Sequence, residues 1–116
     1  VEDEAAVALA LTDTLSHEGY TILSAPNGSA GLEKALAEHP DVIVTDLKMP
    51  ELGGLEMIDA LRKDGWGKTA KVIILSNASD LKSLQTAMEH GTFHYMVKSD
   101  SSMADIVDAV KKQLAE

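Results

Sequence analysis

The sequence contains no cysteine, which excludes disulfide bridges and zinc sites built from thiolates. It also lacks any apolar run close to the roughly 20 residues of a membrane-spanning helix, and no signal peptide is visible. Basic residues are few: 10 lysines and arginines stand against 19 aspartates and glutamates, which gives a net charge of −9. Direct binding to nucleic acid or to an anionic membrane is therefore not expected, because both require a basic face. These features together predict a cytoplasmic protein.

What the sequence does contain is the composition of an ordinary globular domain, with 45% hydrophobic and 25% charged residues. Its 116 residues are enough to bury roughly two-thirds of the surface that the unfolded chain exposes. We therefore expect one domain over residues 1–116, with a real hydrophobic core.

The stretch from Asp41 to Leu55, DVIVTDLKMPELGGL, organises the chain. Residues Val42–Val44 form a continuous β-branched run, which is typical of a strand covered on both faces in a parallel sheet. Such a strand has no use for an ionised acid in its interior. Asp46 is therefore expected at the carboxyl end of the strand, where open α/β sheets form their ligand crevice. The alternative is that Asp46 only starts the turn that contains Pro50 and two glycines.

Strand and helix patterns alternate along the whole chain, with short connections between them. Further β-rich runs predict strands, and apolar residues at helical spacing predict helices. The predicted strands are Tyr20–Ala25, Val72–Leu75 and Phe93–Val97, and the predicted helices are Ala5–Gly19, the segment between Asn27 and Pro40, Leu55–Leu61, Ser79–Gly91 and Ser102–Leu114. Right-handed crossovers then require an α/β fold, in which a parallel sheet carries helices on both faces.

Polar side chains stand at four of the five expected strand ends, which meet at one edge of a parallel sheet. They are Glu2 and Asp3, Asp46, Ser76 and Lys98. Three carboxylates in one place repel one another unless a cation joins them. The acids and the lysine sum to a charge of about −2, which a divalent ion neutralises, and a donor set made of oxygen alone favours magnesium.

An anionic oxygen nucleophile, a metal ion, a lysine and a hydroxyl are the parts that phosphoryl transfer requires. In this interpretation Asp46 attacks phosphorus in line, the metal and Lys98 hold the equatorial oxygens, and Ser76 donates a hydrogen bond to one of them. Taken singly, each residue also has a plain alternative. Glu2 and Asp3 favour the start of a helix, Ser76 begins a turn, and Lys98 is solvated.

The acidic pair, the segment Asp46–Pro50 with Gly54 after it, Ser76, and Tyr95 with Lys98 resemble the receiver domain of response regulators in two-component signalling. The resemblance covers essentially the whole chain. It implies a flavodoxin-like, doubly wound, five-stranded parallel sheet with strand order 2-1-3-4-5.

The resemblance also implies a role for each residue. Asp46 would be the phosphorylated residue, and Lys98 would contact the phosphoryl group. Asp3 and Asp46 would bind Mg²⁺ directly, Glu2 would bind it through a water molecule, and Lys48 would bind it through its backbone carbonyl. Ser76 and Tyr95 would form a switch pair. The implied donor is a histidine kinase or a phosphotransfer protein. The implied output surface is the fourth helix, fifth strand and fifth helix, acting on a downstream domain or protein, with a homodimer possible. Such a domain is not an enzyme in the usual sense, because it catalyses only its own phosphorylation and dephosphorylation.

Two features depart from the family pattern. Ser99 follows Lys98 where the family usually has proline, commonly after a cis peptide bond. Because a cis bond before serine costs about 3 kcal/mol, we predict a trans bond here. In addition, only Val1 represents the first strand, so we expect that further residues of this strand precede Val1 in the natural protein.

Three other interpretations compete with a phospho-accepting receiver. A degenerate receiver keeps the fold and acts as a phosphorylation-independent binding module. A phosphatase of the haloacid-dehalogenase kind requires an aspartate two residues after the nucleophile, where this chain has Lys48. A flavodoxin-like flavin protein requires a hydroxyl- and glycine-rich phosphate loop after the first strand, which this sequence lacks.

Overall fold

The computed structural model describes residues 1–47, 51–76, 94–97 and 101–115. Its helices are α1 (Ala5–His17), α2 (Gly28–Glu38), α3 (Gly54–Lys63), the short 3₁₀ helix η1 (Gly67–Thr69) and α5 (Met103–Ala115). Its strands are β1 (Ile43–Asp46), β2 (Val72–Ser76) and β3 (His94–Val97). The helix predicted at Ser79–Gly91 lies outside the described residues.

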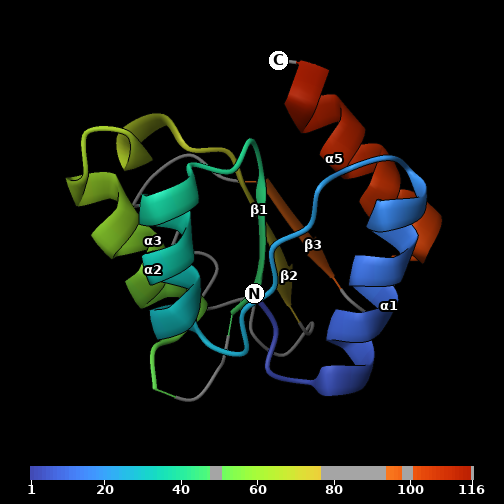
Figure 1. Cartoon of the computed structure of the whole chain (residues 1–116), viewed down its shortest axis with the longest axis horizontal. Helices are drawn as coiled ribbons and strands as arrows, with labels where there is room; N and C mark the ends of the chain where they lie inside the picture. The colour runs from blue at the N-terminus through green and yellow to red at the C-terminus, as the bar shows by residue number, and fades with distance from the viewer. Residues whose placement is uncertain (48–50, 77–93, 98–100, 116) are drawn as a thin grey trace.

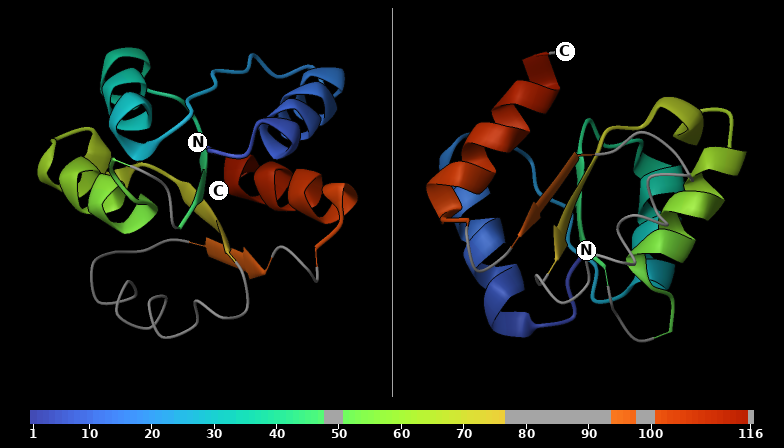
Figure 2. Two further views of the ribbon diagram at one scale, coloured as in Figure 1. Left: turned by 90° about the horizontal axis from the view of Figure 1, so that it is seen from below. Right: turned by 180° about the vertical axis from the view of Figure 1, so that it is seen from behind.

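The described strands form a parallel sheet in the order β1-β2-β3. Helices α2 and α3 cover one face of this sheet, while α1 and α5 cover the other (Figures 1 and 2). The predicted α/β architecture, with a parallel sheet between two helical layers, is therefore confirmed. The register places Asp46 beside Leu75 and Ser76 beside Val97, so the three strands end at the same edge.

The first and second strands of the predicted five-stranded sheet are represented only by short backbone segments at Val1–Glu2 and at Ala25. The terminal ammonium of Val1 donates to the Val44 carbonyl at 2.5 Å, and the Asp46 N–H donates to the Val1 carbonyl at 3.0 Å. On the far side of Val1, the Glu2 N–H donates to the Ala25 carbonyl at 3.0 Å. The spatial order from Ala25 through Val1 to β1, β2 and β3 matches the predicted order 2-1-3-4-5.

The strand predicted at Tyr20–Ala25 is not formed, which corrects the sequence-based assignment. This segment connects α1 to α2 without regular secondary structure, and its backbone contact with the neighbouring strand position is the one from Glu2 to Ala25. A strand needs a neighbour of comparable length to satisfy its backbone groups. The two residues Val1 and Glu2 are too few to provide one.

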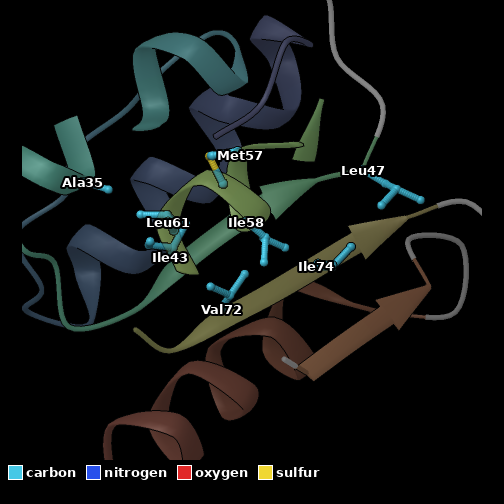
Figure 3. Close-up of a cluster of buried hydrophobic side chains, with 8 residues drawn as sticks. All are labelled: Ala35, Ile43, Leu47, Met57, Ile58, Leu61, Val72 and Ile74. Carbon is cyan, nitrogen blue, oxygen red and sulfur yellow. The ribbon is translucent and has the colours of Figure 1, made fainter. Parts of the chain in front are cut away.

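The larger part of the core lies between the sheet and the α2–α3 layer. Met57, Ile58 and Leu61 of α3 are at most 1% exposed and pack against Ile43 of β1 and against β2 (Figure 3). On the opposite face, Ile73 of β2 packs with Ala109 and Val110 of α5. Since apolar side chains leave both faces of β2, this strand has the continuous hydrophobic pattern of a buried parallel strand.

Several helix ends follow the signals that the sequence predicts. The Asn27 side chain accepts a hydrogen bond from the Ala30 N–H at 2.8 Å and caps α2. Ser102 and Asp105 form the predicted capping box, in which each side chain accepts a hydrogen bond from the other residue's N–H, at 3.1 and 2.9 Å. No described helix has the length and apolar character that crossing a membrane requires.

Candidate functional site

Three carboxylates meet at the carboxyl edge of the sheet. Glu2 and Asp3 lie in the N-terminal segment and Asp46 is the last residue of β1, yet one carboxylate oxygen from each lies within 4.8 Å of the others. This is the convergence that the strand-end argument predicts. The donor atoms are all carboxylate oxygens, which suit a hard divalent cation, so the residues present fit a magnesium ion.

The acidic pair is positioned by the backbone of the residue before it. Val1 is hydrogen bonded to β1 on one side, and Glu2 is bonded to Ala25 on the other, so both residues are held in the plane of the sheet. Glu2 is only 5% exposed, while Asp3 is exposed. The Glu2 carboxylate also accepts a hydrogen bond from the Glu4 N–H at 3.2 Å, which orients it at the start of α1.

Asp46 is held by the strand before it and by the loop after it. Its N–H donates to the Val1 carbonyl, and its carboxylate Oδ1 accepts a hydrogen bond from the Leu47 N–H at 2.7 Å. Leu47 is 4% exposed and belongs to the α3-facing core, so it anchors the strand end. These contacts direct the nucleophile candidate toward the acidic pair rather than into the core.

Gly54 contributes to this site in a way that the sequence does not reveal. Its N–H donates to the Leu47 carbonyl at 2.8 Å, and a Cβ added at Gly54 would lie 2.2 Å from the Asp46 carbonyl oxygen. The start of α3 therefore approaches the backbone of the strand end more closely than any side chain allows. Sequence reasoning places Gly54 in a turn and in the family motif but does not predict this contact, because contact between distant backbones leaves no local signal.

Burial changes the ionisation of a group beside the acids. It lowers the pKa of the Val1 terminal ammonium to about 6, although Glu2 and Asp46 act in the opposite direction. The ammonium is a positive charge close enough to these two carboxylates for each of them to raise its pKa. An added divalent ion would be attracted by the same carboxylates.

The remaining predicted site residues are described only in part. Ser76 ends β2 at the same edge as Asp46, and Tyr95 lies on β3 opposite Ile74, with 43% of its surface exposed. Lys48 and Lys98 lie outside the described residues, as does the peptide bond between Lys98 and Ser99. The predicted trans bond at Ser99 therefore stays a prediction.

Comparison with known protein families shows which family has this fold and this arrangement of acids. The family model described as "response regulator receiver domain" matches residues 1–111. The chain belongs to this family. Receiver domains of two-component response regulators are signalling proteins rather than enzymes in the usual sense, and the chain is such a domain.

Curated relatives of this receiver domain include whole response regulators. Over 119 aligned residues the chain is 35% identical to the transcriptional regulatory protein KdpE of Mycobacterium tuberculosis, covering 99% of this chain and 51% of the relative. It is also 35% identical to the response regulator ArlR of Staphylococcus haemolyticus, covering 84% of this chain and 43% of the relative. The receiver domain thus spans about half the length of the curated relatives it matches.

Solved structures show the same fold. A response regulator receiver domain protein from Clostridium thermocellum is 28% identical, with a TM-score of 0.87 over 98% of this chain and 90% of the other. The receiver domain of the sensor histidine kinase PA1611 from Pseudomonas aeruginosa, 19% identical, has a TM-score of 0.90 over 100% of this chain and 94% of the other. That structure has a magnesium ion coordinated in its active site cleft, and at this identity the likeness shows the fold alone.

Proposed function

We propose that Asp46 accepts a phosphoryl group in a magnesium-dependent step. The observation that carries the proposal is the convergence of Glu2, Asp3 and Asp46, which are distant in sequence but have carboxylate oxygens within 4.8 Å. Asp46 is the acid that ends a sheet strand, and its backbone is fixed on both sides. A fixed carboxylate at a strand end provides the positioning on which phosphoryl transfer depends.

The proposed magnesium site uses oxygen ligands of this chain. Asp3 and Asp46 bind the ion directly, Glu2 binds it through a water molecule, and the Lys48 backbone carbonyl supplies a further ligand. The ion, when bound, neutralises the charge that develops on the phosphoryl oxygens. The support for this assignment is that Asp3 is exposed to solvent whereas Glu2 is only 5% exposed.

The proposed donor is a phosphohistidine of a histidine kinase or a phosphotransfer protein. An Asp46 carboxylate oxygen forms a bond to phosphorus while the bond from phosphorus to the donor's imidazole nitrogen breaks, and the imidazole takes up a proton on leaving. Lys98 pairs with a phosphoryl oxygen and Ser76 donates a hydrogen bond to another. The receiver in this way catalyses its own phosphorylation, and water later removes the phosphoryl group by attack on phosphorus.

The proposed switch involves Ser76 and Tyr95. Phosphorylation changes the charge at Asp46 from −1 to nearly −2, which draws the Ser76 hydroxyl toward the phosphoryl oxygen. Tyr95 is 43% exposed in this structure, and in the proposed switch its ring turns inward after the Ser76 hydroxyl has moved. The proposed output surface combines the fourth helix, β3 and α5, and it acts on an output domain, a downstream protein or a second copy of the chain.

Replacing Asp46 by asparagine should abolish phosphorylation, because the amide is not a nucleophile for phosphorus. The measurement is intact mass after incubation with MgCl₂ and phosphoramidate, which gives the parent chain the added mass of one phosphoryl group. Asp108→Asn, on an exposed position of α5, is the matched control and should be phosphorylated like the parent. A phosphorylated Asp46→Asn variant would overturn the assignment.

The same experiment tests the degenerate alternative. A phosphorylation-independent module would acquire no phosphoryl group in the parent chain and no beryllofluoride adduct at Asp46. We expect both modifications in the parent and neither in Asp46→Asn. NMR chemical shifts of Tyr95 and its neighbours on β3 should move on beryllofluoride binding, which reports the proposed switch.

A further inference from the structure

An asparagine followed by glycine stands where the start of α2 meets the segment that leads from β1 into α3. Asn27 caps α2 and Gly28 is the first residue of this helix, while Glu51 and Leu52 lie shortly before α3. The proposed phosphoryl transfer uses neither Asn27 nor Gly28. In an asparagine–glycine sequence the backbone nitrogen of the glycine can attack the asparagine side chain with little steric hindrance, because glycine has no Cβ.

The glycine at this position is required by packing. Gly28 is buried, and its N–H donates to the Leu52 carbonyl at 2.9 Å. A Cβ added at Gly28 would overlap the same carbonyl oxygen, so a residue with a side chain does not fit against this backbone. The fold therefore demands, directly after Asn27, the residue that leaves the asparagine side chain most open to attack.

In the folded chain, the groups that would react are all held by hydrogen bonds. The Asn27 Oδ1 accepts from the Ala30 N–H at 2.8 Å, and its Nδ2 donates to Glu51 Oε2 at 3.2 Å. Attack on the Asn27 Cγ requires the Gly28 nitrogen to lose its proton, release the Leu52 carbonyl and turn toward the side chain. The reaction can therefore proceed only when the contact between the start of α2 and the segment before α3 opens.

We infer that Asn27 is a site of deamidation, and that opening of this contact sets the rate. A bond forms from the Gly28 nitrogen to the Asn27 Cγ while the bond from Cγ to Nδ2 breaks. Nδ2 leaves as ammonia, with the proton that the Gly28 nitrogen has given up. Water then opens the resulting succinimide at Cγ, which gives aspartate, or at the backbone carbonyl, which gives isoaspartate.

Both products change how α2 is joined to the segment before α3. Aspartate at position 27 still accepts from the Ala30 N–H, because aspartate caps helices as well as asparagine does. It has no donor for Glu51, however, and places a second carboxylate beside it. Isoaspartate adds a methylene to the backbone and so displaces Gly28 from Leu52. The modification thus loosens this contact irreversibly, and the inference does not depend on phosphoryl transfer.

The test measures deamidation of the 116-residue chain in mildly alkaline buffer, with and without guanidinium chloride. Peptide mapping by mass spectrometry follows the replacement of the Asn27 amide by a carboxyl group. Glu51→Ala removes the acceptor of Nδ2 but leaves the cap at Ala30 intact. Glu33→Ala, on an exposed position of α2, makes the same change of charge and is the matched control. The other asparagine of the sequence, Asn77, precedes alanine and serves as the reference in denaturant.

Deamidation of Asn27 should be at least about tenfold slower in the folded parent than in denaturant, because access to the reactive geometry follows the free energy of local opening. Folded Glu51→Ala should react faster than folded Glu33→Ala, and both should react alike in denaturant, where the contact is absent. In denaturant, Asn27 should react faster than Asn77. Equal rates for the folded and denatured parent, or for the two folded variants, would overturn the inference.

The effect of the product is tested with Asn27→Asp, which carries the aspartate from the start. Hydrogen exchange of the Gly28 amide, measured by NMR, should be faster in this variant than in the parent, because the contact with Leu52 opens more readily. Exchange of the Ala30 amide should change little, since the cap is kept. Unchanged exchange at Gly28 would contradict the inference that the product loosens this contact.

Discussion

At the scale of single residues, Glu2 and Asp3 are neighbours in sequence but differ in environment. Glu2 is 5% exposed and is tied to the Glu4 N–H, while Asp3 faces solvent. A buried carboxylate loses hydration and depends on fixed partners, whereas an exposed one exchanges its water freely. This difference supports the proposed division of roles, in which Asp3 contacts magnesium directly and Glu2 acts through water.

Removing the charge of Asp3 should weaken magnesium binding and, without metal, stabilise the fold. We expect the magnesium affinity of Asp3→Asn to fall by about tenfold, because affinity for hard cations follows the ligand charge. Its urea midpoint in EDTA should rise, because repulsion with Asp46 and Glu2 is relieved. Calorimetric titration with MgCl₂ measures the affinity. Glu4→Gln is the neighbouring control and should change neither value; equal affinities for the two variants would contradict the prediction.

At the scale of elements, the site depends on how closely α3 approaches the end of β1. Gly54 begins α3, and its missing side chain lets the helix start lie against the Asp46 carbonyl. The adjacent hydrogen bond from Gly54 to Leu47 fixes the same contact. The core contacts of Met57, Ile58 and Leu61 then hold α3 in this place, so packing far from the acids determines where Asp46 lies.

Gly54→Ala should therefore destabilise the domain and slow phosphorylation. The added Cβ meets a backbone oxygen that cannot turn away, and overpacking of this kind costs about 1–3 kcal/mol. Gly65→Ala is the matched control, because a Cβ there would meet nothing within 4 Å. Urea unfolding and the rate of phosphorylation by phosphoramidate are the measurements. If the two alanine variants proved equally stable, the close approach would not constrain the site.

At the scale of the whole molecule, stability depends on a sheet whose central position is held by Val1 and Glu2. The terminal ammonium of Val1 lies within this layer, where burial lowers its pKa from 8.0 to about 6. The folded chain thus loses this proton more readily than the unfolded chain. Between about pH 6 and pH 8 the unfolded state binds more protons, so unfolding should become harder as the pH rises.

For the 116-residue chain in EDTA, the free energy of unfolding should increase from pH 6 to pH 8 by roughly 2 kcal/mol from this group, since each pKa unit corresponds to about 1.4 kcal/mol. Acetylation of the Val1 amine removes the titration and should flatten this part of the profile. Because the two proteins differ only at this amine, a difference between their profiles reports the amine. Parallel profiles for the free and acetylated chains would exclude the terminus as the source.

The sequence by itself determined the order of elements and the chemistry at the strand ends. Apolar β-branched runs predict β1 and β2, helical spacing predicts α3 and α5, and the cap at Asn27 is recognisable because caps are local. The meeting of Glu2, Asp3 and Asp46 also followed, because parallel strands deliver their carboxyl ends to one edge. These features depend on local pattern and on general rules of connection.

Only the tertiary structure decided how this edge is built and which of the predicted strands form among the described residues. The β-rich run Tyr20–Ala25 has the composition of a strand, yet strand formation depends on a hydrogen-bonding neighbour, which two residues cannot provide. The need for glycine at Gly54 arises from distant backbones brought together. Such distances belong to the packed molecule, so no local pattern in the sequence encodes them.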